Sequence, residues 1–273
     1  MSWLAVRVSA GAAREAALAA LFELGSLGVQ ELGEDLVTHF PDDVAADTVI
    51  GAVQRAAPGS TVATSHVADV DWSEEWKRGV GAHDLGALSI VPPWLAAGRD
   101  PARTIVIEPE MAFGTGEHET TRGVVRLLPA AIRLGDRVAD LGAGSAVLAI
   151  AAAKLGAAHV AAIEIDHDAI ANAIENVERN GLTGVVTVLE GDAAVLLPLV
   201  APVRVVLANI LSSVLRELLP TIRDALSAEG EALLSGILVE ERATMLAALA
   251  SDGWRVVAED VEGPWWTARV ARP

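Results

Sequence analysis

The segment from Arg137 to Asp166, RVADLGAGSAVLAIAAAKLGAAHVAAIEID, decides the fold of this 273-residue chain. It combines an apolar strand, a glycine-rich turn at Gly142 and Gly144, a helix, and a second strand that ends near Glu164. Such a turn lets the backbone approach a ligand closely, and the start of the following helix presents free N–H groups. The segment therefore predicts a βαβ unit with a nucleotide-type site at its strand ends.

Outward from this unit, apolar strands alternate with helices from about residue 86 onward. This pattern is typical of a parallel sheet covered on both faces, and the last two strands predict an added antiparallel hairpin. Before it, the order β-α-β-β-α-β over the first 66 residues indicates a small ferredoxin-like domain. We expect a ferredoxin-like α+β domain for substrate recognition at 1–67, a linker helix at 68–85, and an α/β domain at 86–273.

Composition narrows the classes of function. The formal net charge of −17 disfavours nucleic acid as a direct partner, because phosphate binding needs clustered Lys and Arg. There is no cysteine, which excludes disulfides and thiol catalysis, and no pair of histidines has metal-ligand spacing, so no metal is expected. We see no signal peptide and no membrane span, and we expect a cytoplasmic, monomeric protein.

Three carboxylates mark the ends of three consecutive predicted strands: Asp140, Glu164 and Asp192. Glu164 lies 22 residues after Gly142, where an acidic side chain accepts hydrogen bonds from ribose hydroxyls, and Asp166 is expected to cap the next helix. Asp192 either contacts an adenine amino group or caps the helix after it. Carboxylates oppose a pyrophosphate but suit S-adenosylmethionine, which carries a sulfonium and an ammonium. The charges therefore favour this methyl donor over NAD.

The stretch MAFGTGEHETT, from Met111 to Thr121, lies between a predicted strand and a predicted helix. It lacks the G-x-x-x-x-G-K-[ST] pattern of a phosphate loop, and its glutamates oppose an anion. We predict a lid or side wall over the methionine end of the donor. His118 is expected to order the loop, with stacking or proton relay as alternatives, and Phe113 either covers the donor or packs in the core.

Taken together, these motifs resemble those of known methyltransferases. The glycine-turn block is similar to the first motif of the seven-stranded, Rossmann-like S-adenosylmethionine methyltransferases. The loop, the segment LANIL, the small N-terminal domain and the W-x-x-x-W linker resemble the PrmA family, which methylates large-subunit ribosomal protein eleven. The resemblance implies donor contacts at Thr121, Gly142, Glu164 and Asn209, with Gly144 in the same turn. Ala146 stands where glycine is commoner in the family.

The expected function is thus S-adenosylmethionine-dependent N-methylation of lysine side chains and the N-terminal amine of this basic ribosomal protein. Asn209 is the candidate that aims the amine, and its alternative role is to cap the next helix. Trp265 and Trp266 either line a peptide groove or pack in the C-terminal hairpin. A methyltransferase with another amine acceptor, an NAD-dependent oxidoreductase and a non-catalytic binding module remain alternatives.

Overall fold

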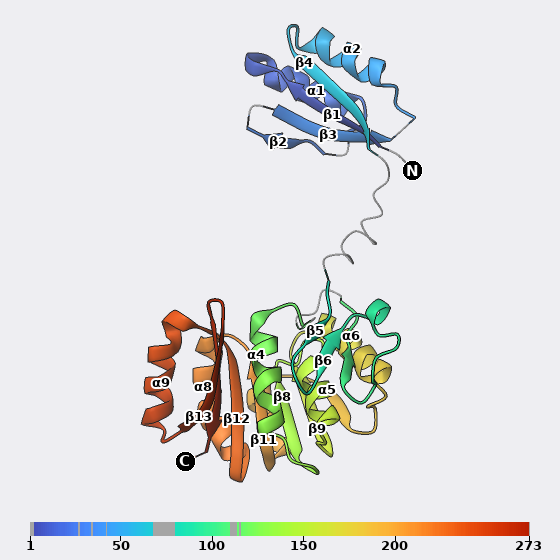
Figure 1. The fold of residues 1–273 in the computed structure, drawn as a ribbon. Helices are drawn as coiled ribbons and strands as arrows, with labels where there is room; N and C mark the ends of the chain where they lie inside the picture. Colours follow the sequence, from blue (N-terminus) through green and yellow to red (C-terminus); the bar gives the residue numbers. More distant parts are fainter. Residues whose placement is uncertain are drawn as a thin grey trace. The chain divides into compact units, whose positions relative to one another are not determined.

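The computed structural model describes residues 3–272 apart from 27, 34, 42, 68–79, 110–113 and 115. The chain divides into two compact units, Met1–Gly79 and Val80–Pro273 (Figure 1). Phe113 and the two linker tryptophans, Trp72 and Trp76, lie outside the described residues. In the described part of the chain, no helix has the length and apolar character needed to cross a membrane.

The N-terminal unit has the predicted β-α-β-β-α-β order. Its elements are β1 (Trp3–Ser9), η1 (Gly11–Ala13), α1 (Arg14–Glu23), β2 (Gln30–Leu32), β3 (Asp35–Pro41), α2 (Ala46–Ala56) and β4 (Thr61–Val67). The strands form an antiparallel sheet in the order β2-β3-β1-β4. Alternate residues of β1, Leu4, Val6 and Val8, are buried against the helices, as a half-buried strand requires. This is the expected ferredoxin-like arrangement.

The C-terminal unit is an α/β structure built on a seven-stranded sheet. Its first elements are β5 (His83–Asp84), β6 (Ser89–Val91), η3 (Pro93–Leu95), β7 (Thr104–Val106), α4 (Glu119–Leu127), η4 (Leu128–Ala130), β8 (Arg137–Leu141), α5 (Val147–Lys154), β9 (His159–Glu164) and α6 (His167–Arg179). They are followed by β10 (Val186–Glu190), α7 (Ala193–Val200), β11 (Val203–Asn209), α8 (Ser212–Ala225), β12 (Leu226–Leu238), η5 (Val239–Glu241), α9 (Arg242–Ser251), β13 (Arg255–Glu262) and β14 (Trp265–Ala271).

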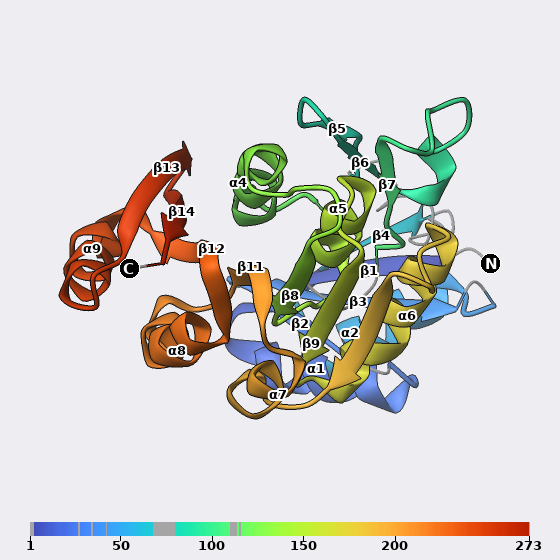
Figure 2. The ribbon, with the colours of Figure 1, turned by 90° about the horizontal axis from the view of Figure 1, so that it is seen from below.

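The strand order of the large sheet is β10-β9-β8-β11-β12-β14-β13. The first five strands are parallel, and β14 runs antiparallel to both of its neighbours, so the predicted hairpin is confirmed. Helices α4, α5 and α6 cover one face, and α7, α8 and α9 cover the other (Figure 2). The strands are therefore buried on both sides, which explains their nearly continuous apolar sequences.

Two details differ from the sequence expectation. The helical pattern that begins at Ser212 continues in the sequence to Ala228, but α8 ends at Ala225 and β12 begins at Leu226, because the segment from Leu226 pairs with β11 and β14. Near the end of the expected linker helix, His83–Asp84 form strand β5 in a three-stranded sheet with β6 and β7. Tertiary pairing decides both boundaries, which local propensity does not resolve.

Candidate active site

A cavity of about 750 Å³ opens at the carboxyl ends of the parallel strands. The chain turns from β8 toward β9 and β10 on one side and returns to β11 on the other, so the cavity lies at the topological switch point, where ligands bind in such sheets. Its walls are formed by His118, Thr120, Gly142, Gly144, Ile163, Glu164, Ile165, Gly191, Asp192, Ala193, Ala194, Asn209, Ile210, Leu211, Val214, Glu217, Leu218, Gly236 and Trp265.

The glycine turn brings the backbone close to the segment after β11. Gly142 has φ +68°, and a Cβ built there would lie 2.4 Å from Cγ2 of Ile210. Ala146, which precedes α5, is the one non-glycine residue with positive φ in the described chain, at 64°. Its backbone is therefore strained, because an alanine adopts here a left-handed conformation that suits the glycine commoner at this position. The methyl group of Ala146 cannot cap α5, and Asp140 does this instead: its Oδ2 accepts from Ala149 N at 2.9 Å.

Glu164 is held in place by three backbone N–H groups. Its Oε2 accepts from Gly144 N at 2.7 Å, and its Oε1 accepts from the N–H groups of Ile165 and Asp166, each at 2.8 Å. The side chain is buried yet borders the cavity. An ionised carboxylate has about four lone-pair sites, so an oxygen remains able to accept a ligand hydroxyl. The geometry is compatible with the predicted ribose contact.

Asp140 lies beneath the turn and does not line the cavity. It is 1% exposed, and its Oδ1 has no hydrogen-bond partner among the described residues. The pKa of this carboxyl is raised to about 7, mainly by burial and to a smaller extent by the charge of Glu164, while the Ala149 N–H opposes the shift. The structure thus gives Asp140 a capping role, and its predicted donor contact stays a prediction.

The two other acidic strand ends behave as helix caps. Asp166 Oδ1 accepts from Asp168 N at 3.0 Å and begins α6, as predicted. Asp192 Oδ1 accepts from Ala194 N at 2.8 Å and begins α7, and the residue also borders the cavity. For Asp192 the two alternatives are compatible, because one carboxylate oxygen remains for a ligand.

Polar side chains from the loop and from β11 form the opposite end of the cavity. Asn209 Nδ2 lies 3.4 Å from Thr121 Oγ1, and the N-cap residue of α8 is Leu211, which provides no side-chain cap, so the capping alternative for Asn209 is wrong. Thr121 is completely buried, whereas Thr120 borders the cavity. The direct donor contact predicted for Thr121 stays a prediction. Thr120 is a residue that the sequence reasoning missed.

His118 caps α4, and its expected role of ordering the loop stays a prediction. Its Nδ1 accepts from Thr120 N at 3.3 Å and caps α4, and it lies 2.8 Å from Thr120 Oγ1. Its ring meets that of Trp265 edge to face, with centroids 5.0 Å apart. The two tryptophans of the hairpin therefore differ in their surroundings: Trp265 borders the cavity, while Trp266 is buried in the core.

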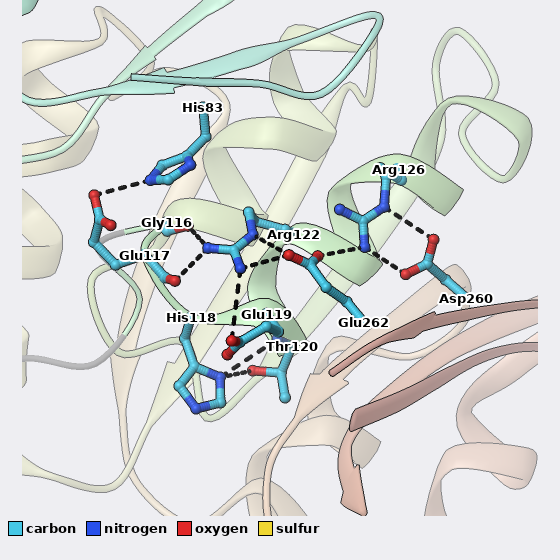
Figure 3. A network of polar contacts seen from close by, with 10 residues as sticks. All are labelled: His83, Gly116, Glu117, His118, Glu119, Thr120, Arg122, Arg126, Asp260 and Glu262. Atoms are coloured by element: carbon cyan, nitrogen blue, oxygen red, sulfur yellow. Dashed lines mark hydrogen bonds and ion pairs between the residues drawn. The ribbon is translucent and has the colours of Figure 1, made fainter. Parts of the chain in front are cut away.

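Further contacts hold the loop on both sides. Ser145 Oγ, in the glycine turn, donates to Gly114 O at 2.8 Å. Glu117 Oε1 accepts from Gly81 N at 3.0 Å and lies 2.9 Å from His83 Nε2 (Figure 3). Thus one of the loop's glutamates binds the chain segment before β6, away from the cavity.

Several cavity residues carried no functional signal in the sequence, among them Ile165, Leu211 and Val214, which are apolar yet exposed. Gly236 did carry a signal in the sequence, because an isolated glycine inside a strand indicates a bulge or a close approach of the backbone. It lies at a register shift of β12, has φ +80°, and a Cβ there would lie 2.3 Å from Ile210 O.

The charges of the cavity have one sign. Among the described residues that line it there are three carboxylates, Glu164, Asp192 and Glu217, and no lysine or arginine. A pyrophosphate would be repelled by these groups, whereas a cationic ligand would be attracted.

Comparisons with known proteins agree with this geometry. The family model described as ribosomal protein L11 methyltransferase (PrmA) matches residues 5–273. A ribosomal protein L11 methyltransferase of Thermus thermophilus is 36% identical over 248 residues, which cover 91% of this chain and 91% of the relative. One from Synechococcus sp. (strain RCC307) is 40% identical over 207 residues, covering 74% and 69%. The crystal structure of a ribosomal protein L11 methylase from Lactobacillus delbrueckii subsp. bulgaricus superposes with a TM-score of 0.62 at 30% identity, over 70% of this chain and 98% of that one.

Proposed function

The chain belongs to the PrmA family of ribosomal protein L11 methyltransferases, and from this premise we propose that it transfers methyl groups from S-adenosylmethionine to lysine side chains and the N-terminal amine of ribosomal protein L11. The observation that carries the donor assignment is the cavity with three carboxylates and no basic side chain among its described lining residues. This charge pattern fits a sulfonium and an ammonium, and it opposes the pyrophosphate of NAD. The proposal implies that the enzyme acts in the cytoplasm, where its basic substrate, ribosomal protein L11, is present.

We assign the donor to the half of the cavity over β8, β9 and β10. In this donor half Glu164 accepts hydrogen bonds from the ribose hydroxyls, and Asp192 accepts one from the adenine amino group. Ile165 and Leu211, each 70% exposed, supply apolar surface for the purine ring. Gly142 and Gly144 let the backbone lie against the ligand without a Cβ between them. When bound, S-adenosylmethionine supplies a methyl group that its sulfonium already activates.

The amine enters the other half of the cavity, over β11, β12 and β14. We call this the acceptor half, and its lining residues are His118, Thr120, Asn209, Gly236 and Trp265. A lysine amine with a pKa of about 10.4 costs roughly 4–5 kcal/mol to deprotonate at pH 7, against about 1 kcal/mol for an α-amino group near 7.7. A nearby carboxylate would raise this cost. Two of the three cavity carboxylates, Glu164 and Asp192, belong to β9 and to the start of α7, on the donor side, and the third, Glu217, belongs to α8.

Asn209 orients that amine. Its Nδ2 group points to Thr121, so its side-chain oxygen is left to accept an amine hydrogen and to aim the lone pair. Trp265 and Thr120 exclude water from the same side, which lowers the solvation of the amine before transfer. The chemistry needs positioning and desolvation more than a strong base, which agrees with the capping role of His118.

Mass spectrometry of intact, purified ribosomal protein L11 after incubation with the enzyme and donor tests the proposal. We expect mass increments of about 14 Da per methyl group, one CH₂ each, from wild-type enzyme. Asn209→Ala should lose turnover while it keeps affinity for S-adenosylhomocysteine, measured by calorimetry. Unmodified ribosomal protein, or tight binding of NAD to the same cavity, would overturn the assignment.

A further inference from the structure

Arg122, on the first turns of α4, joins two segments that border the acceptor half. Its Nη1 donates to the carbonyl oxygens of Gly116, at 3.4 Å, and Glu117. Its Nε and Nη2 donate to Glu262 Oε1, at 3.0 and 2.6 Å, on strand β13 (Figure 3). Only 14% of this side chain is exposed, so the contacts are largely shielded from water. The planar guanidinium has five donors, which suits it to bridge such separate acceptors.

Both of the bridged segments lead directly to a side chain of the acceptor half. Gly116 and Glu117 immediately precede His118, and Glu262 ends β13 three residues before Trp265. The rings of His118 and Trp265 meet at 5.0 Å. One side chain outside the cavity lining thus binds both segments that lead to these two cavity residues.

A second arginine one helical turn further on provides an internal comparison. Arg126 Nε donates to Asp260 Oδ2 at 2.9 Å, and its Nη2 lies 2.7 Å from Glu262 Oε2. In the described part of the chain, the side-chain contacts of Arg126 lead to β13 alone and not to the loop (Figure 3). It shares the helix, the charge and the partner Glu262 with Arg122, but it pairs with Asp260 where Arg122 contacts the loop carbonyls and Glu119.

We propose that Arg122 is a positioning residue for methyl transfer, which fixes His118 and Trp265 relative to each other and so shapes the acceptor half. The inference rests on the proposed function of the cavity. It concerns the acceptor half, because the carbonyls that Arg122 binds precede His118, whereas the donor half is built from the ends of β8, β9 and β10.

Loss of this bridge should displace the acceptor wall without unfolding the loop. Glu117 Oε1 still holds Gly81 and His83, and Ser145 still holds Gly114, so the loop keeps anchors on two sides. A misplacement of about 1 Å near a reacting group costs on the order of 100-fold in rate. We expect Arg122→Met to lower kcat with the ribosomal protein about 10- to 100-fold, with affinity for S-adenosylhomocysteine within about twofold of wild type.

The test compares full-length Arg122→Met, Arg122→Lys and Arg126→Met with wild type at saturating donor. Both Met variants should lower the unfolding temperature, because both lose ion pairs to β13. Only Arg122→Met should lower kcat by the expected 10- to 100-fold, whereas the kcat of Arg126→Met should stay within about threefold of wild type. The kcat of Arg122→Lys should lie between these two values, because lysine keeps the charge but not the planar set of donors. Amide hydrogen exchange of residues 116–120 should accelerate in Arg122→Met alone.

Equal kcat values and equal exchange in Arg122→Met and Arg126→Met would overturn the inference and leave a merely stabilising role for both arginines. Failure of the proposed function is distinguishable, because wild-type enzyme would then leave ribosomal protein L11 unmethylated. In that case the exchange comparison and the calorimetry still decide whether Arg122 holds the loop.

Discussion

Substitution of Gly236 by alanine tests how closely β12 approaches the segment after β11. A Cβ at this position would lie 2.3 Å from the carbonyl oxygen of Ile210 and 2.8 Å from its carbonyl carbon, which are backbone atoms that cannot rotate away. The residue also has φ +80°, a conformation that is strained for alanine. Gly98 provides a matched control, since it has φ +77° in the same unit and a Cβ there would meet nothing within 4 Å.

The magnitudes separate the two causes. Left-handed backbone costs a non-glycine residue about 1–2 kcal/mol, and the loss of unfolded-chain entropy on replacing glycine returns about 0.4–1 kcal/mol. Gly98→Ala should therefore lower the free energy of unfolding by about 1 kcal/mol. Gly236→Ala adds the overlap with Ile210, for which overpacking costs of about 1–3 kcal/mol are typical. Its total loss should be about 2–4 kcal/mol.

Differential scanning calorimetry measures both variants in the transition of the same unit. For a unit of this size, each kcal/mol lowers Tm by about 2–4 °C. Because the atoms that must shift belong to Ile210, whose side chain lies against Gly142 in the donor half, we also expect Gly236→Ala to bind S-adenosylhomocysteine about tenfold more weakly, while Gly98→Ala binds it as wild type does. Equal Tm losses in the two variants would refute the reasoning, since the β11 segment would then move aside at no cost.

Three further substitutions test individual side chains. The folded pKa of Asp140, about 7, exceeds the unfolded value near 3.9, so ionisation disfavours folding by up to about 4 kcal/mol as pH rises from 4 to above 7. The urea midpoint of wild type should fall over this range relative to that of Asp140→Asn, and parallel midpoints would contradict the buried charge. Glu164→Gln should lose about 1–3 kcal/mol of stability, because its amide cannot accept all three backbone N–H groups, and should weaken S-adenosylhomocysteine binding in calorimetry at least tenfold. Thr121→Val should leave that affinity within about twofold, since Thr121 is fully buried and contacts Asn209; a larger loss would support a direct donor contact.

Much of the architecture follows from local patterns. The alternation of Leu4, Val6 and Val8 in β1 indicates one buried face, the apolar run of β8 indicates burial on both faces, and such patterns suffice for the element order of both units. The cap at Asp166 is equally local, because a carboxylate and an N–H two residues later are neighbours in the chain. In such features, the residues that interact are also neighbours in the sequence.

The cavity is different, because its residues come from strands far apart in the chain. Trp265 and Trp266 are adjacent in sequence and point to opposite faces of β14, and only the neighbours across each face decide that one borders the site and the other fills the core. Thr120 and Thr121 are both buried, and the packing of α4 against the sheet likewise decides that Thr120 borders the cavity.

By itself, the sequence determined the two-unit α/β architecture, the glycine turn, the acidic strand ends and hence the preference for a cationic donor, since periodicity and charge are properties of short segments. Only the tertiary structure decided that no side chain fits at Gly236 beside Ile210, that Asp140 lies buried beneath the turn, and that Arg122 binds both the loop and β13. The physical reason is that these features depend on contacts between residues distant in the chain, 26 positions apart for Ile210 and Gly236 and 140 for Arg122 and Glu262. Their distances exist only once the sheet has brought its strand ends together.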